Sequence, residues 1–405
     1  MDLLSPGPYW PIKDGLPAAF PALERDVTAE VAVIGAGISG ALVAWHLAEA
    51  GIETVVVDRR EAAHGSTSGS TSLLQYEIDT PLHILARRFG TPAAAYCYRR
   101  SRRAVHALGS LARRLRIECG YEAKESLLVA SGARHVPRLR REFEARVAAG
   151  LAVEWWPRSR VSRASTLPHP AAILSRDGAQ VDAYRLTYGL LEAAQRRGAR
   201  VFDRTRVIRR RATGRRVELI TDRGARIRAG QVVIASGYEA DALLPRRLTA
   251  LHSTFALISE PMREFSGWPA DRCLIWETAD PYLYLRTTPD NRAIIGGLDL
   301  PFRDPAARDR AVAAKAAALH ARFRRLFPRI SFEPAYAWAG TFAKTADGLP
   351  LIGAHPQIPR TWFALGYGGN GITFSLIAAE LIRDQLLGRP NRDGAYFGFK
   401  RLELL

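Results

Sequence analysis

The chain has 405 residues, of which 47% are hydrophobic and 24% are charged, and its formal net charge is +18 at pH 7. This length allows two domains with a large core, and the composition is that of an ordinary soluble globular protein. Only five of the 58 basic residues are lysines, and the arginines are spread over much of the chain. Solvated arginines therefore explain the charge better than a nucleic-acid or membrane footprint does.

The cysteines and the N-terminus exclude several classes of protein. Cys97, Cys119 and Cys273 are odd in number and share no close spacing, which argues against a disulfide framework or a metal site and favours a reducing compartment. The first 20 residues lack a signal-peptide pattern, and no apolar run reaches the ~20 residues of a membrane helix. We therefore expect a soluble cytoplasmic protein with no metal ion and no membrane span.

The first elements of the chain predict an arm followed by a dinucleotide-binding unit. Residues 1–29 contain five prolines, which predict an irregular arm. In residues 31–58, an apolar strand runs into glycines at Gly-x-Gly-x-x-Gly spacing, a helix follows, and a second apolar strand ends at Asp58. A glycine-rich turn in another α/β protein could share the glycines, but it would leave the acid unexplained.

Each part of this unit has a physical task. The first glycine permits a tight turn, the second lets a pyrophosphate approach the backbone, and the third lets helix and strand pack closely. The N-terminus of the helix offers unpaired N–H groups and the positive end of its dipole to the phosphates, and Asp58 can accept hydrogen bonds from a ribose. The expected cofactor-binding residues here are Gly35, Gly37, Ile38, Ser39, Gly40, Asp58 and Arg59.

A run of small residues, Gly65–Ser72, follows the second strand. Alone, it could be a flexible linker. Its place after a dinucleotide unit favours a loop whose backbone N–H groups approach a cofactor. Gln75 would then lie near the reactive end of the cofactor, and Glu77, close by, could suit a cationic amine.

The rest of the chain predicts two interleaved domains without an internal repeat. Amphipathic helices are expected after Thr91, over residues 186–194 and after Asp304, and a hairpin is expected to turn at residues 222–224. The buried strand 232–236 ends at Gly237, as where a chain passes beneath a nucleotide. Strand signals are densest over residues 251–300, and glycine-rich turns return near the C-terminus.

With these elements in place, the chain resembles the D-amino-acid-oxidase-like family of FAD-dependent oxidoreductases, which includes glycine, sarcosine and gamma-glutamylputrescine oxidases. The resemblance covers nearly the whole chain and rests on residues 35–58, 65–72, 232–237 and 345–350, followed by 366–373. It implies an α/β and α+β fold, in which a Rossmann-like FAD-binding domain is interleaved with a substrate domain built on a largely antiparallel sheet. The expected ranges are 1–88, 182–244 and 336–405 for the FAD-binding domain and 89–181 and 245–335 for the substrate domain.

By resemblance, the cofactor is FAD, with its ADP half on the N-terminal unit and its isoalloxazine between the 65–72 run and the 368–371 turn. A helix beginning near Ile372 could stabilise negative charge on a reduced flavin with its N–H groups and dipole. Some relatives attach FAD through a cysteine at about the position of Gly340, where this chain has none nearby, so we expect non-covalent FAD. The further cofactor-binding residues implied are Ser66, Ser68, Gly69, Ser70, Val207, Gly237, Gly340, Gly368, Gly369, Asn370, Gly371, Ile372 and Thr373.

The family oxidises a C–N bond by hydride transfer from a neutral amine to flavin N5, and the resulting imine hydrolyses. The protein then supplies position, desolvation and electrostatics rather than a catalytic triad. Arg286 is a candidate partner for a substrate carboxylate, because a guanidinium binds both oxygens. Tyr284 shares its strand face and Gln75 is a third candidate, although an arginine in so arginine-rich a chain could equally be a surface group.

Several alternatives stay open at this point. Electrons could pass to oxygen, or to a quinone or carrier protein as in a dehydrogenase. A flavin enzyme acting on modified tRNA is a third hypothesis, which only the +18 charge favours, and a non-catalytic FAD-binding protein is a fourth. No second glycine motif indicates a separate NAD(P)H site, and Asp58 beside Arg59 and Arg60 would repel the 2′-phosphate of NADP.

Overall fold

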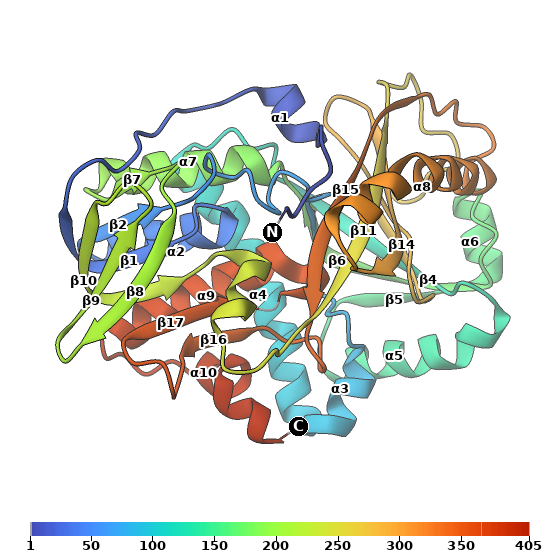
Figure 1. The fold of residues 1–405 in the computed structure, drawn as a ribbon. Coiled ribbons are helices and arrows are strands. Elements are labelled where there is room, and N and C mark those ends of the chain that lie inside the picture. The colour runs from blue at the N-terminus through green and yellow to red at the C-terminus, as the bar shows by residue number, and fades with distance from the viewer. Residues whose placement is uncertain (1, 366, 405) are drawn as a thin grey trace.

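The computed structural model describes residues 2–365 and 367–404 and contains two large sheets that lie side by side (Figure 1). The first, called here the parallel sheet, has the strand order β16-β17-β10-β1-β2-β7. Within it, β1, β2, β7, β10 and β17 run parallel, and β16 is antiparallel to β17. The bounds are β1 (Val27–Ile34), β2 (Thr54–Val57), β7 (Arg200–Phe202), β10 (Arg226–Ile234), β16 (Leu351–Ala354) and β17 (Thr361–Leu365). Two further strands, β8 (Val207–Thr213) and β9 (Arg216–Thr221), extend it from β10 as an antiparallel hairpin.

The second sheet, called the antiparallel sheet, has the order β15-β11-β14-β13-β12-β4-β6-β3, with β5 paired to β6. Only β4 and β12 run parallel in it. The bounds are β3 (Leu73–Leu74), β4 (Glu122–Val129), β5 (Val153–Pro157), β6 (Ala171–Gln180), β11 (Ala250–Ser259), β12 (Leu274–Glu277), β13 (Tyr284–Thr287), β14 (Ala293–Pro301) and β15 (Pro334–Lys344). The expected combination of a Rossmann-like sheet with a largely antiparallel sheet is confirmed.

Helices cover these sheets and supply most of the cores. One face of the parallel sheet packs on α2 (Ile38–Glu49), which is buried between α7 (Ala183–Arg196) and α9 (Gly371–Leu386). One face of the antiparallel sheet packs on α8 (Pro305–Leu326) through Leu319 and Phe323. The remaining helices are α1 (Tyr9–Asp14), α3 (Leu82–Phe89), α4 (Thr91–Leu115), α5 (Val136–Ala148), α6 (Arg158–Ala164) and α10 (Asp393–Phe397), with 3-10 turns η1 (Ala133–His135), η2 (Gly237–Leu243), η3 (Gly368–Asn370) and η4 (Phe399–Leu404).

The structure differs from the sequence expectations in local details. The expected irregular arm contains α1, and β1 already begins at Val27. Gly90, not Thr91, is the N-cap of α4. The strands β3 and β15 belong to the antiparallel sheet, although the predicted ranges place most of their residues in the FAD-binding domain. The domain boundaries themselves stay a prediction.

Three properties of the described residues bear on the excluded classes of protein. Cys97, Cys119 and Cys273 are buried and free. No group of three or more potential metal ligands occurs in the described part of the chain. Over residues 2–365 and 367–404, every helix is too short or too polar to cross a membrane.

Candidate active site

A single cavity of about 680 Å³ extends from the end of β1 to the antiparallel sheet. Its first end, called the parallel-sheet end, is lined by residues 34–35, 37–39, 57–60, 205–207 and 235–239. Its second end, called the antiparallel-sheet end, is lined by side chains from β11, β13, β14 and β15 and from the segments before and after β3. A cavity of this size is in the range of about 300–1,000 Å³ typical of cofactor and ligand sites.

The parallel-sheet end has the geometry of a phosphate-binding turn. Gly35 has φ +112°, and a Cβ there would lie 2.4 Å from the carbonyl oxygen of Ala235. A Cβ at Gly40 would lie 1.8 Å from the carbonyl oxygen of Gly35, so the third glycine lets α2 pack against the turn. The N-cap residue of α2 is Gly37, and Thr67 Oγ1 accepts a hydrogen bond from the Ile38 amide at 3.0 Å, so the positive end of the helix dipole lies beside the cavity.

Asp58 is placed at the end of β2 and is held by backbone groups. Its Oδ2 accepts a hydrogen bond from the Ala36 amide at 2.7 Å, and its Oδ1 accepts one from the Arg60 amide at 2.9 Å. Burial raises the pKa of Asp58, while these two amides favour its ionised form. Arg59 also lines the cavity and pairs with Glu239.

The loop 65–72 lies along the middle of the cavity and is fixed by side chains from distant elements. The indole nitrogens of Trp10 and Trp338 donate to the carbonyl oxygens of Ser70 and Gly69 at 2.6 and 2.9 Å. The hydroxyl of Ser66 is buried and has no hydrogen-bond partner among the described residues. Because an orphaned buried hydroxyl is costly, Ser66 is a natural contact for a bound polar group.

Arg286 does not line the cavity, contrary to the expectation that it faces a substrate. Its side chain is 1% exposed, and its Nη1 donates to the carbonyl oxygens of Ser72 and Val181 at 2.8 and 2.9 Å and of Thr71 at 3.2 Å. Burial lowers the pKa of Arg286 to about 10, so the group stays cationic at neutral pH. The guanidinium thus fixes the end of the 65–72 loop through the carbonyl oxygens of Thr71 and Ser72.

The glycine-rich turn before α9 closes the other side of the cavity. The Gly369 amide donates to Asp79 Oδ2 at 2.9 Å, and the Tyr282 hydroxyl donates to Asp79 Oδ1 at 3.1 Å. Asn370 donates to the carbonyl oxygens of Gln75 and Glu77 at 3.1 and 2.7 Å, which fixes the segment after β3. Gly366, the first residue of the predicted turn, lies outside the described residues.

Alternate residues of the antiparallel sheet face the cavity. Tyr284 of β13, Thr254 of β11 and Phe342 of β15 line it, while the adjacent residues Leu283, Leu285 and Phe255 pack into the core against α8. Burial and the nearby Asp299 raise the pKa of Tyr284 to about 12, so its hydroxyl is neutral at physiological pH. This end therefore combines aromatic rings with neutral hydroxyls.

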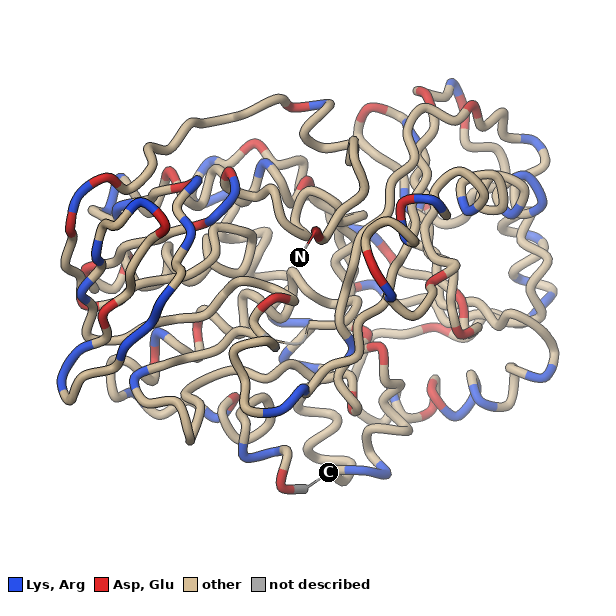
Figure 2. Tube along the Cα trace, viewed as in Figure 1, with Lys and Arg blue, Asp and Glu red and all other residues tan. Residues whose placement is uncertain are grey.

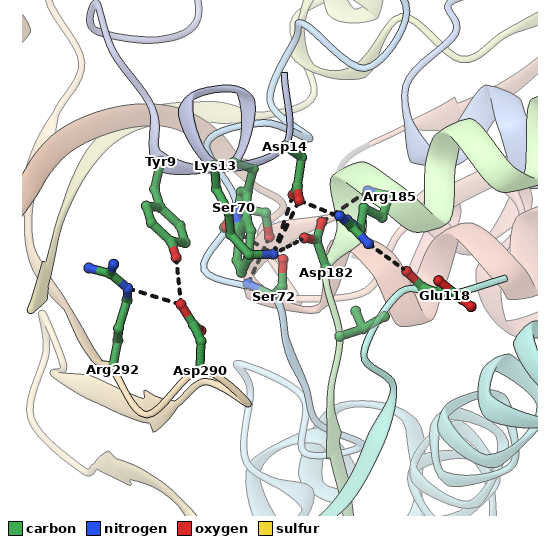
Figure 3. A network of polar contacts seen from close by, with 12 residues as sticks. Tyr9, Lys13, Asp14, Ser70, Ser72, Glu118, Asp182, Arg185, Asp290 and Arg292 are labelled. Atoms are coloured by element: carbon green, nitrogen blue, oxygen red, sulfur yellow. Dashed lines mark hydrogen bonds and ion pairs between the residues drawn. The ribbon is translucent and has the colours of Figure 1, made fainter. Parts of the chain in front are cut away.

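The N-terminal arm covers the cavity, a role that its sequence pattern does not indicate. Leu3 and Leu4 line the cavity, and Leu4 packs where a Cβ of Gly69 would be. Figure 3 shows how α1 is attached: the Tyr9 hydroxyl donates to Asp290 at 3.3 Å, and Lys13 Nζ lies 3.2 Å from Asp182 Oδ2. The arm thus links the turn between β13 and β14 to the N-terminus of α7.

Most predicted site residues come together at this cavity. Those that line it are Gly35, Gly37, Ile38, Ser39, Asp58, Arg59, Ser66, Gly69, Ser70, Gln75, Val207, Gly237, Tyr284, Gly340, Gly368, Gly369, Gly371 and Ile372. Gly40, Ser68, Asn370 and Thr373 do not line it and hold neighbouring backbone instead. Glu77 is also absent from the lining, since it is buried 3.4 Å from Arg146 Nη1. The lining residues that sequence reasoning missed include Leu4, Thr254, Asp299 and Phe342.

Comparisons with known proteins agree with this geometry. The chain is 25% identical to gamma-glutamylputrescine oxidoreductase of Escherichia coli K12, over 94% of this chain and 88% of that protein. It is 26% identical to glycine oxidase of Geobacillus kaustophilus, over 88% of this chain and 92% of that protein. The crystal structure of the Geobacillus kaustophilus glycine oxidase superposes with a TM-score of 0.76 at 23% identity, covering 92% of this chain and 99% of that one.

A match to a family model shows which protein family the chain belongs to. Residues 30–385 match the family described as FAD dependent oxidoreductase (DAO), which spans both sheets and all the cofactor-type turns of the cavity. The resemblance stated from the sequence is thereby confirmed. The chain belongs to the DAO family of FAD-dependent oxidoreductases.

Proposed function

We propose that this enzyme binds FAD non-covalently in the cavity and oxidises the C–N bond of an amine or amino acid, with oxygen as the electron acceptor. The observation that carries the proposal is the continuity of the cavity, which joins a phosphate-binding turn to an aromatic pocket on the antiparallel sheet. The printed names of two relatives, a gamma-glutamylputrescine oxidoreductase and a glycine oxidase, support an amine or amino-acid substrate.

The residues present fit FAD. The N-terminus of α2 and the unpartnered Ser66 hydroxyl would hold phosphates, and Asp58 would receive the ribose of the ADP half. The turn of η3 and the N-terminus of α9 would lie against the isoalloxazine. None of the three cysteines is among the described residues that line the cavity, which supports non-covalent binding.

Bound FAD would supply the hydride acceptor, and the chain itself supplies position and exclusion of water. Tyr284, Phe342 and Thr254 form the wall against which a substrate would be oriented. The apolar side chains of Leu3 and Leu4 in the N-terminal arm line the cavity and would help to exclude water from it. Enclosure of this kind strengthens electrostatic interactions and protects an imine from premature hydrolysis.

The test uses the purified protein loaded with FAD. We expect about one FAD per chain, released intact when the protein is denatured, and hydrogen peroxide formed in step with amine consumption in air. Failure to bind FAD would overturn the whole proposal. Flavin that stays attached after denaturation would overturn the non-covalent mode. Substrate oxidation that proceeds only after a quinone or carrier protein is added, with that acceptor reduced in place of oxygen and no peroxide formed, would replace oxygen by that acceptor.

A further inference from the structure

Asp299 places an acidic group at the antiparallel-sheet end of the cavity. Its carboxylate lines the cavity, and its Oδ1 is buried with no hydrogen-bond partner among the described residues. Burial raises the pKa of Asp299, and a side-chain hydrogen bond with Thr254 and the charges of Lys344 and His252 partly offset this effect. A buried carboxylate oxygen without a donor is costly unless a ligand supplies one.

A bulge in β14 turns this side chain toward the cavity. Pairing of β14 with β11 shifts by one residue, because the step from Ser253 to Phe255 is matched by the step from Leu300 to Gly297. Ile294 and Gly296 face the cavity side, so an unbroken strand would point Leu298 there and Asp299 into the core. Instead, Leu298 packs against the core under α8, and Asp299 lines the cavity.

The bulge is held in a conformation that few residues adopt. Leu298 has φ +57°, in the left-handed region that disfavours a leucine. Its carbonyl oxygen accepts a hydrogen bond from Lys315 Nζ of α8 at 2.8 Å, which helps to hold the turn. Strained backbone and bulges cluster where a functional side chain must be aimed. The aim of Asp299 is therefore a built feature of the sheet.

The surroundings of Asp299 suit an ammonium group. The ring centroids of Tyr282 and Tyr284 lie 6.0 Å from each other, and both tyrosines line the cavity, as Asp299 does. Aromatic faces together with a carboxylate form a favourable site for an organic cation. In the described chain, Lys344 and His252 act on Asp299 by charge without an ion pair within 4.0 Å, and its Oδ1 has no hydrogen-bond partner, so this oxygen can accept from a ligand.

Among the described lining residues, the strands of the antiparallel sheet contribute no arginine for a substrate carboxylate. Arg286 is committed to three backbone carbonyls outside the lining. Among the described lining residues, the arginines are Arg59, Arg60, Arg206 and Arg247, which come from the segment after β2, the segment before β8 and the segment before β11. A carboxylate placed at the Tyr284 wall would instead meet Asp299, a like charge.

We infer that Asp299 binds an ammonium group of the substrate, and that the enzyme prefers amines without a carboxylate beside the reacting nitrogen. This inference rests on the proposed function and names the substrate class of the same site. It predicts that primary amines and diamines reduce the enzyme more efficiently than α-amino acids do. The ammonium bound by Asp299 is the second amino group of a diamine or the reacting group of a monoamine before it loses its proton.

The experiment compares FAD-loaded wild type with Asp299→Asn and with a control, Asp271→Asn, which removes an exposed acid from the loop before β12. Substrates are butylamine, 1,4-diaminobutane, glycine and D-alanine. Because a hydrogen bond to a charged group is lost, we expect Asp299→Asn to raise KM for the amines about tenfold or more, with little change in kcat. We expect no such change in the control, and a larger KM effect for the diamine would assign its second amino group to Asp299.

A second readout does not depend on turnover. Tetramethylammonium is not a substrate, because its nitrogen has no lone pair to assist hydride loss from carbon. It should raise the Tm of wild type and Asp271→Asn but not of Asp299→Asn. Efficient reduction by amino acids with no response to amines would overturn the inference and leave the proposed function standing. An unchanged amine KM in Asp299→Asn would also overturn it. Loss of FAD reduction by every substrate would overturn the proposed function, while the Tm shift would still decide the role of Asp299.

Discussion

At the scale of single residues, Arg286 shows how a correct pattern can lead to a wrong position. The two-residue period places Arg286 on the same sheet face as Tyr284, as expected. One more step along the strand, however, brings Arg286 beneath the 65–72 loop, where it donates to backbone carbonyls. Sequence spacing defines the face of a strand but not what lies above each residue on it, because that depends on segments distant in the chain.

Replacement of Arg286 tests this supporting role. Arg286→Ala should lower the free energy of unfolding by about 3 kcal/mol and weaken FAD binding, because it leaves several buried carbonyls without donors. Chemical denaturation and FAD titration measure the two effects. Arg228→Ala is the control, since the exposed ion pairs of Arg228 should contribute at most about 1 kcal/mol. Full FAD affinity in Arg286→Ala would contradict the role.

Asp182 gives the arm a dependence on pH. Burial and a hydrogen bond with Asp14 raise the pKa of Asp182 from 3.8 to about 6. The folded state therefore binds the Asp182 proton more tightly than the unfolded chain does. Protonation of Asp182 thus stabilises the fold fully below about pH 4, and this stabilisation is lost as the pH rises through about 6.

Asp182→Asn removes the titration and keeps a side chain that can cap α7, as Asp182 does by accepting from the Arg185 amide at 2.9 Å. As the pH rises from about 4 to about 7, the Tm of wild type should fall relative to that of the variant. Thermal unfolding followed over this range measures the difference. A difference that stays constant with pH would show that Asp182 does not titrate there.

At the scale of elements, sequence patterns predicted those helices, strands and turns that depend on contacts between residues close together in the chain. The glycine turn, α2 and β2 follow from a strand, a helix and an acid within 28 residues, and Asp304 caps α8 by accepting from the Ala307 amide. The β14 bulge could not be predicted, because one extra residue reverses the faces without changing composition. The sequence thus suggested Glu77 as the acid that could suit a cationic amine. In the structure Glu77 pairs with Arg146, and Asp299 lines the cavity.

The position of the N-terminal arm could not be predicted either. Its prolines correctly indicate little regular structure, but Trp10 and Tyr9 find partners that lie 60 and 281 residues away in the chain. Those contacts order α1 over the cavity, and no window of sequence contains them. The arm is therefore an element that the rest of the fold defines.

Trp10→Ala tests the arm as a cover. Loss of the indole removes the hydrogen bond to Ser70 and the packing on Tyr9, so FAD should dissociate faster and stability should fall by about 3–5 kcal/mol. Stopped-flow release of FAD measures the rate. The control is Trp155→Ala, which removes a tryptophan from a small separate core and should leave FAD release unchanged. Equal release rates in the two variants would contradict a covering role.

At the scale of the whole molecule, the net charge does not mark a single binding face. Figure 2 shows basic residues on both halves of the molecule, mixed with acidic residues on many segments. A denser group, Arg209–Arg211, lies on β8 at the open edge of the parallel sheet. Charged side chains on an edge strand discourage pairing with another chain, which accounts for this group without a nucleic acid.

The two sheets and the helices between them serve one purpose in this account, which is to bring a phosphate-binding turn and an ammonium-binding wall to the ends of the same cavity. The most direct test mixes the FAD-loaded protein with 1,4-diaminobutane, butylamine, glycine and D-alanine without oxygen. We predict that the amines abolish the visible absorbance band of the oxidised flavin and that air restores the band with formation of peroxide. A flavin that remains oxidised with every amine and amino acid would contradict the account.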